Sequence, residues 1–299
     1  MSLWKKGQAQ DVVSAAAGKA ATCRRSAQHV LQFWGAFSLL LLLTWTTPAR
    51  ASDFWDEVRN PGLAAQKTHL RRAEQALQEN QADRALIEAE AAVASCSACA
   101  AGHVLRGRAL AALGRLGEAV VAFERALQLS GEALDVENVA LVAAAVAIHV
   151  GRPDLGVAIL TRTLARTQES ATRSRGLLML ADALLALGPA DLRRAIAAYG
   201  QAMADDGARK HAVLGLALAL HRKGEEAQAF ALARRAEQEG DPSAASAWLP
   251  EPERAARIAL WLGAIGDRIA AEQAWLSAAE GDGPWAAHAR AAAAGAGKP

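Results

Sequence analysis

Apolar residues in this chain recur at helical spacing, and no stretch alternates at period two over a useful length. Between residues 66 and 281 one pattern occurs six times: a small residue, a larger residue four positions later, and a small residue three positions after that. These spacings place all three positions on one face of a helix. The six triplets are Ala85/Ala89/Ala92, Ala119/Phe123/Ala126, Gly156/Leu160/Thr163, Ala195/Tyr199/Ala202, Ala229/Ala233/Ala236 and Ala271/Trp275/Ala278.

A residue suited to ending a helix lies five to seven positions before each triplet, and the six are Asn80, Gly114, Gly151, Gly188, Gly224 and Gly266. Gly and Asn adopt the left-handed conformation in which many helices end. A further small residue lies 12 to 14 positions before each triplet, and these six are Ala73, Gly107, Ala144, Ala181, Gly215 and Ala259. Each unit therefore predicts a helix, a tight turn and a second helix, with small residues where the helices touch.

The spacing between units is irregular. The first positions of successive triplets lie 34, 37, 39, 34 and 42 residues apart. We expect the extra residues to lie in loops between units, where added length costs little. The longest step predicts a loop around 238–252, which contains Pro242, Trp248, Pro250 and Pro252.

The unit resembles the tetratricopeptide repeat (TPR), a helix–turn–helix of 34 residues. The second unit matches most clearly, through Gly107, Leu110, Gly114, Ala119, Phe123 and Ala126. Units one and three depart from the pattern, because Ala89 replaces the usual aromatic residue and Gly156 and Thr163 replace alanines; the aromatic residue early in the first helix is missing throughout. The resemblance implies an all-α, right-handed α-solenoid of about six TPR-like repeats with a concave groove.

Both ends of such an array need a polar cap. Residues 282–299 predict a C-terminal capping helix and tail, with Pro284 in the first turn of a helix over 284–294. Residues 52–65 predict a short helix whose Phe54 and Trp55 cover the first unit. In an alternative interpretation, this Phe-Trp segment is a docking peptide.

Residues 1–51 have the three parts of a secretory signal. A basic region ends at Arg24-Arg25, an apolar stretch from Phe33 to Leu43 follows, and Ala49-Arg50-Ala51 forms a small-x-small cleavage site. We expect cleavage after Ala51 and a periplasmic or secreted protein. The alternative is an uncleaved inner-membrane anchor, although residues 30–47 are shorter than the roughly 20 apolar residues of a membrane span.

The charge balance changes once this segment is set aside. The whole chain has 33 basic and 31 acidic residues, of which six and one lie in residues 1–51. The remaining part is slightly acidic and has no basic run, which argues against nucleic-acid binding. Hydrophobic residues make up 52% of the chain but aromatic residues only 5%, a composition that suits closely packed helices.

Motifs of enzymes are missing from the sequence, and we expect no enzymatic activity, no cofactor and no metal. The one chemical motif is Cys96-Ser97-Ala98-Cys99, at the junction of units one and two. Three interpretations compete: a small disulfide, free thiols, and a redox or metal site. Haem attachment would need His at position 100, which is Ala, and zinc would need a second ligand pair.

The TPR resemblance implies a binding groove lined by the first helix of each unit. The residues expected to face it are Val104, Arg108, Leu141, Ile148, His149, Arg175, Leu178, Asp182, Leu185, Arg209, Leu216 and Leu220. Some of these leucines are alternatively core residues between helices. An aliphatic groove with basic edges suits an amphipathic or extended apolar segment of a protein partner.

The function expected from these features is that of a periplasmic scaffold or adaptor in an envelope complex. The alternatives are a membrane-anchored assembly subunit of a secretion, outer-membrane or motility machine, and a regulator of a periplasmic cell-wall enzyme. Contact with a membrane is expected only through an uncleaved N-terminal segment. The sequence does not indicate the oligomeric state.

Overall fold

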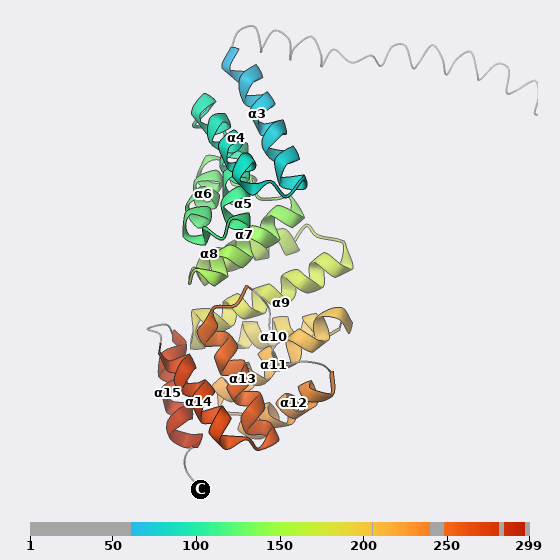
Figure 1. Ribbon diagram of the computed structural model, residues 1–299. Helices are drawn as coiled ribbons and strands as arrows, with labels where there is room; N and C mark the ends of the chain where they lie inside the picture. Colours follow the sequence, from blue (N-terminus) through green and yellow to red (C-terminus); the bar gives the residue numbers. More distant parts are fainter. Residues whose placement is uncertain (1–60, 205, 240–247, 281–283, 297–299) are drawn as a thin grey trace, which may run out of the picture. The chain divides into compact units, whose positions relative to one another are not determined.

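The computed structural model describes residues 61–204, 206–239, 248–280 and 284–296 (Figure 1). All regular structure in these ranges is helical, and residues Gly62–Pro299 form one compact unit. The proposed signal, with Phe54 and Trp55, lies outside the described ranges. No helix within them is long and apolar enough to cross a bilayer.

Six helix pairs follow one another along the chain, and a single helix closes the series (Figure 1). The pairs are α3 (Pro61–Gln78) with α4 (Ala82–Ser95), α5 (Ala100–Ala112) with α6 (Leu116–Leu129), α7 (Glu137–His149) with α8 (Pro153–Leu164), α9 (Ser170–Leu187) with α10 (Leu192–Ala202), α11 (Asp206–Lys223) with α12 (Glu226–Glu239), and α13 (Glu251–Ile265) with α14 (Arg268–Ala279). The closing helix is α15 (Pro284–Ala296). We call the first helix of each pair its A helix and the second its B helix.

The repeated small residues form the contacts between these helices. Every position of the six triplets is buried, and so is the small residue that precedes each of them on the A helix. In the second unit, a Cβ atom added to Gly107 would lie 2.7 Å from the ring of Phe123. Glycine is therefore needed at this position because the aromatic ring of the B helix occupies the space of a side chain.

The six turn residues all have a positive φ angle, as the sequence predicts. Five of them end their helix with the same pair of hydrogen bonds; in the second unit, the Gly114 amide donates to the Ala111 carbonyl (3.1 Å) and the Arg115 amide to the Leu110 carbonyl (2.9 Å). This is the Schellman arrangement, which satisfies carbonyl groups at the end of a helix. In these five units, the tight turn between the A and B helices thus depends on one Gly or Asn residue that can adopt a positive φ angle.

Gly188 departs from this prediction. Its φ of 131° is positive, but its ψ of −168° is extended rather than left-handed helical. Pro189 follows it, and the residue before a proline is disfavoured in helical conformations. A short 3₁₀ helix, η1 (Pro189–Asp191), takes up the inserted residues of this turn.

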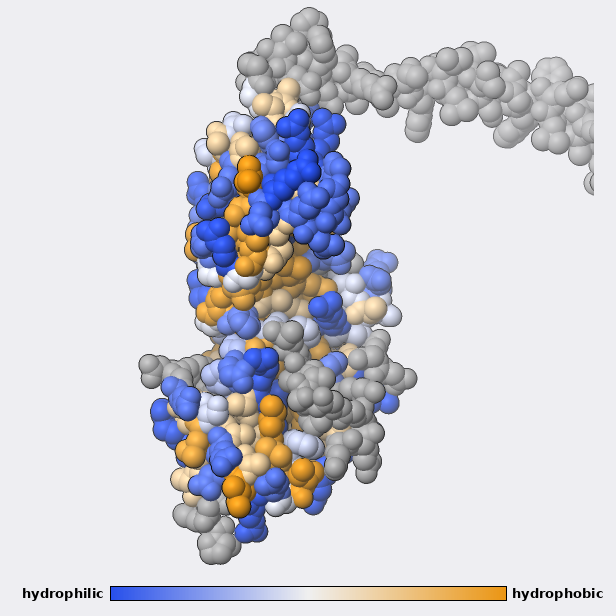
Figure 2. All heavy atoms as spheres, viewed as in Figure 1, coloured by the Kyte–Doolittle hydropathy of each residue, from blue (hydrophilic) through white to orange (hydrophobic). Residues whose placement is uncertain are grey.

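The described array begins with α3 and ends with α15. The first A helix starts at Pro61, so residues 61–65 belong to it and not to a separate cap. Figure 2 shows a hydrophilic surface over α3, which suits the first helix of an array. At the other end, α15 packs against α14 and α13 and also reaches α9, six α-helices earlier in the array.

Candidate functional site

The residues predicted to line the groove all lie on A helices, but their exposure differs. Val104, Leu141, Ile148, Leu178, Asp182, Leu185 and Leu220 are buried, whereas Arg108, His149, Arg175, Arg209 and Leu216 are partly or fully exposed. Successive A helices contact one another, and the side chains at these contacts are enclosed between the helices. The buried residues are therefore part of the packed interior in this structure, and of them only Leu178 also lines the open pocket described below.

Two residues of the connection between α12 and α13 also pack on the A-helix side. Leu249 is 2% exposed and belongs to the apolar cluster that contains Val146 of α7 and Met179 of α9. Trp248 is partly buried beside it, and its indole Nε1 donates to Oδ2 of Asp182 at 2.9 Å. Residues 248–250 lie outside the helices, as expected, but this part of the connection is not free of the core, because Leu249 belongs to it and Trp248 packs against it.

Asp182 lies at the centre of a buried polar cluster. Its Oδ1 accepts hydrogen bonds from the Tyr199 hydroxyl, at 2.6 Å, and from Nη2 of Arg257. Asp182 and Arg257 are each 2% exposed, and Tyr199 is fully buried. The cluster joins the A helices of units four and six to the B helix of unit four, and it closes this part of the A-helix side to a partner.

The protonation states in this cluster follow from burial and from the mutual charges. Burial, and then the negative charge of Asp182, raise the pKa of the Tyr199 hydroxyl well above its usual value, so this group remains a donor. Burial alone would lower the pKa of Arg257, but Asp182 and neighbouring groups raise it overall. The Arg257 guanidinium therefore stays charged, and Asp182 provides its counter-charge.

An open pocket of about 370 Å³ remains on the A-helix side, next to Trp248. It is lined by Ala171, Ser174, Arg175 and Leu178 of α9, by Ala208 and His211 of α11, and by Trp248. The guanidinium carbon of Arg175 lies 5.8 Å from the centroid of the Trp248 ring, a cation–π distance. The hydrogen bond to Asp182 fixes the indole of Trp248, which forms an aromatic wall of the pocket. Arg175 adds an exposed cation beside it.

The other exposed groove candidates are separate from this pocket. Nη1 of Arg108 donates to the Glu74 carboxylate of the preceding A helix at 2.6 Å. Arg209 donates through Nε to the carbonyl of Met203 at 3.2 Å. The structure thus brings Arg175 and Leu178 together at one site, whereas Arg108 and Arg209 have structural contacts elsewhere.

The two cysteines lie at the junction of units one and two. A disulfide joins Cys96, which follows α4, to Cys99, which precedes α5, with the Cα atoms 5.4 Å apart.

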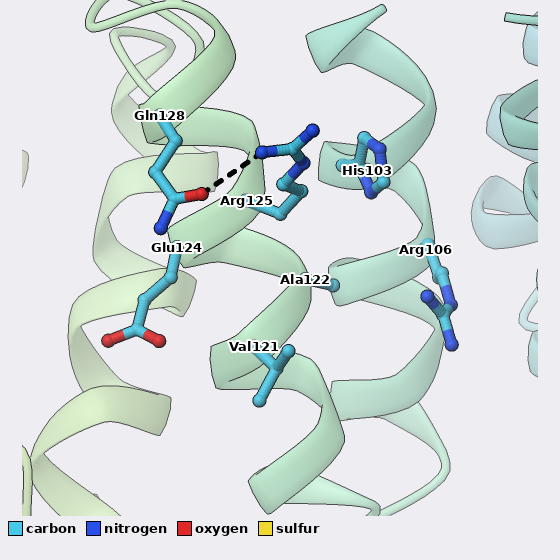
Figure 3. A pocket seen from close by; sticks show the side chains of 7 residues that line it. All are labelled: His103, Arg106, Val121, Ala122, Glu124, Arg125 and Gln128. Atoms are coloured by element: carbon cyan, nitrogen blue, oxygen red, sulfur yellow. Dashed lines mark hydrogen bonds between the residues drawn. The ribbon is translucent and has the colours of Figure 1, made fainter. Parts of the chain in front are cut away.

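A second pocket, of about 210 Å³, lies between α5 and α6, and is lined by His103, Arg106, Val121, Ala122, Glu124, Arg125 and Gln128. Figure 3 shows the Arg125 side chain extending from α6 toward His103 of α5.

A third pocket, of about 540 Å³, lies where α15 meets α11 and α14. Its wall contains His221, stacked on Trp275 with ring centroids 5.6 Å apart, and His288, whose Nε2 lies 3.1 Å from Nδ1 of His221. Burial, and then the charges of His221 and Arg222, lower the pKa of His288 to about 4. Within the described ranges, no three His, Cys, Asp or Glu side chains are grouped closely enough to hold a metal ion.

Sequence reasoning missed the roles of Trp248, Leu249 and Arg257. A signal was present for Arg257, because it is a charged residue in an otherwise apolar stretch from Ala255 to Leu260 of an A helix. Asp182 stands out in the same way between Gly176 and Leu187. Two opposite charges on the buried faces of A helices would have suggested an ion pair, but the repeat pattern did not show that they meet.

Comparison with known proteins gives similarity in solved structures only: no protein-family model and no curated protein sequence matches the chain. YrrB, a TPR protein with an unusual peptide-binding site, is 17% identical over 57% of this chain and 84% of its own, with a TM-score of 0.48. MamA is 12% identical over 58% and 91%, with a TM-score of 0.48. PilF of Pseudomonas aeruginosa is 13% identical over 78% and 99%, with a TM-score of 0.44.

At these levels of similarity, the fold assignment rests on the helix pairs of this chain. Six pairs have their small residues buried at the helix contacts, and five of the six end their A helix with the same hydrogen-bonded cap. Each B helix is followed by the A helix of the next unit, and the two contact each other. The described part of the chain is an α-solenoid with the fold of a tetratricopeptide-repeat protein, made of six helix–turn–helix units and a closing helix.

Proposed function

We propose that this chain is a protein-binding scaffold whose partner docks at the pocket between α9 and α11. The observation that supports this site is the combination of a held aromatic wall, Trp248, with the exposed guanidinium of Arg175 on the A-helix side. Helical repeats commonly bind extended or helical protein segments on this side. The site is open, whereas Asp182 and Arg257 fill the neighbouring interior.

The lining residues indicate the chemistry of the partner segment. Leu178, Ala208 and the Trp248 ring offer apolar contact, while Arg175 and the imidazole of His211 lie at the same pocket. Among the described residues, no carboxylate lines it. A partner that inserts an apolar side chain and presents a carboxylate next to it would satisfy both the apolar wall and the Arg175 charge.

Site-specific photocrosslinking in cells tests this site directly. A photoreactive amino acid at Ala171, which is exposed at the pocket, should capture the partner, whereas the same group at Ala197, exposed on the B helix α10, should not. Arg175→Glu should remove the Ala171 adduct, and Arg193→Glu, an equal charge change on α10, should leave it. Adducts of equal yield at both positions, or an adduct unaffected by Arg175→Glu, would refute the site.

We further propose that the scaffold acts in the periplasm as part of an envelope complex. The support is the sequence of residues 1–51, with its basic region, apolar stretch and Ala49-Arg50-Ala51 site. N-terminal sequencing of the protein from an osmotic extract should give Ser52 as the first residue. An intact Met1 in the membrane fraction would instead favour the anchored alternative.

A further inference from the structure

The Cys96–Cys99 disulfide occupies an accessible turn between two repeats. Cys96 is the residue that ends α4, Cys99 is the N-cap of α5, and only Ser97 and Ala98 separate them. Both cysteines are partly exposed, and the two residues between them are exposed. A small thiol therefore has access to this disulfide in the folded protein, which is not the case for a disulfide inside a core.

The two sulfur atoms differ in their surroundings. Cys99 stands at the N-terminus of α5, where no side chain caps the helix and no acidic residue lies in the first turn. The Gly102 amide donates to the Cys99 carbonyl at 3.2 Å, which orients the first turn of the helix. Amide groups at a helix N-terminus stabilise negative charge, so a thiolate on Cys99 is favoured over one on Cys96, which follows the opposite end of α4.

His103 supplies a second, independent feature next to this turn. This residue is 7% exposed, and its Nε2 donates to the Ser97 carbonyl at 3.1 Å, inside the loop closed by the disulfide. Its buried Nδ1 has no hydrogen-bond partner among the described residues, and it lies at a pocket that Arg106, Glu124 and Arg125 also line (Figure 3). Cysteines that exchange readily are partly exposed and have a stabilised thiolate, and Cys99 meets both conditions at the N-terminus of α5.

We propose that Cys96 and Cys99 form a reversible thiol–disulfide exchange site for low-molecular-weight thiols of the glutathione class, with Cys99 as the leaving thiolate. A thiolate of the reductant attacks Sγ of Cys96 and forms a mixed disulfide, and the electron pair of the broken bond stays on Sγ of Cys99. A second thiolate then attacks the reductant's sulfur in the mixed disulfide and releases Cys96 as a thiolate. Two thiols become one disulfide while the protein disulfide becomes a dithiol.

The surrounding structure should survive this reaction. A loop of two residues removes little entropy from the unfolded chain, so opening it costs little stability. The junction is also held by packing, since a Cβ atom on Gly102 would already lie 3.0 Å from the Val93 side chain of α4. The exchange therefore changes the covalent state of the turn while units one and two remain folded.

The decisive experiment measures exchange in the native protein. The full chain with Cys23→Ser, which leaves only this pair of cysteines, is equilibrated with mixtures of reduced and oxidised glutathione. After an acid quench, free thiols are alkylated and the mass of the intact protein is measured by mass spectrometry. We expect millimolar reduced glutathione to convert most of the protein to the dithiol at unchanged far-ultraviolet circular dichroism. Oxidised glutathione should restore the disulfide. A disulfide that resists reduction until urea unfolds the chain would overturn the proposal.

Single variants test which sulfur carries the stabilised thiolate. Cys96→Ser leaves Cys99 free, and Cys99→Ser leaves Cys96 free, both in the Cys23→Ser chain. At neutral pH we expect iodoacetamide to alkylate Cys99 about threefold faster than Cys96, because the gain in thiolate fraction exceeds the loss in nucleophilicity. Equal rates, or a faster Cys96, would refute the assignment of Cys99 as the leaving group.

Discussion

The carboxylate of Asp182 in α9 accepts a hydrogen bond from the guanidinium of Arg257 in α13, 75 residues further along the chain. The helix pair α11/α12 lies between them in sequence. Both residues are almost fully buried, and the Tyr199 hydroxyl and Trp248 indole complete the coordination of the carboxylate. This contact ties units four and six directly to each other.

Removing one partner of this pair should strongly destabilise the protein. Asp182→Asn leaves the buried Arg257 charge without its counter-charge, which typically costs about 3–5 kcal/mol. Replacing both residues, as in Asp182→Leu with Arg257→Met, should cost less than the single change because neither charge of the pair then remains buried. Urea unfolding followed by circular dichroism measures both; a single variant as stable as the wild type would contradict the role of the pair.

A methyl group at Gly107 should be destabilising even though alanine favours helix. The Cβ atom would overlap the Phe123 ring, so we expect Gly107→Ala to cost about 1–3 kcal/mol. Gly117→Ala, in the B helix of the same unit, meets no atom within 4 Å and should stabilise the protein by about 0.5 kcal/mol. Thermal unfolding of the two variants should therefore shift in opposite directions.

Acidification should release α15 from its neighbours. The pKa of His288 is about 4 in the folded protein, against an ordinary value of 6.5, and burial also lowers that of His221. Between pH 6.5 and about 4 the unfolded state binds more protons than the folded state, because His288 has the lower pKa in the folded state. The stability of this contact is therefore complete above pH 6.5 and falls as the pH falls toward 4. Hydrogen exchange of α15, corrected for intrinsic rates, should show weaker protection at pH 5 than at pH 7.

A histidine variant checks the origin of this effect. His288→Leu removes the titrating group at the α15 contact and should make the protection of α15 less dependent on pH. His149→Leu, which changes an exposed histidine of α7, should leave the dependence as it is. A wild-type pH dependence in the His288 variant would assign the effect to another group.

Truncating Leu249 should show that the connection before α13 is part of the core. Because this side chain is 2% exposed, we expect Leu249→Ala to cost about 2–5 kcal/mol. The same change at Leu276, which is 53% exposed on α14, should alter the stability by less than about 0.5 kcal/mol. Equal, small effects in urea unfolding would mean that Leu249 is only loosely packed.

Local features of this fold could be predicted from the sequence, whereas contacts between distant helices could not. A turn such as Gly114 depends on one residue and its immediate neighbours, so a short pattern identifies it. The burial of Ala119 and Phe123 follows from their spacing along one helix. The Asp182–Arg257 pair instead depends on how units four to six stack, which no local spacing records.

The groove was harder to predict for the same reason. An A helix such as α9 is apolar on several sides, and its sequence does not distinguish a side chain that contacts a neighbouring A helix from one that faces outward. Leu178 and Leu185 were therefore grouped with Arg175, although only Arg175 is exposed. Long charged side chains were the better guide to the surface, because burying an unpaired charge is costly.

The packed connection before α13 bears on how this array could have evolved. Where repeats touch only their neighbours, single units can be gained or lost by duplication and deletion without disturbing the rest. Leu249, however, lies between units five and six in the sequence and belongs in space to an apolar cluster that includes residues of units three and four. We expect related chains to vary in the number of repeats before α7 and to inherit everything after it as one block.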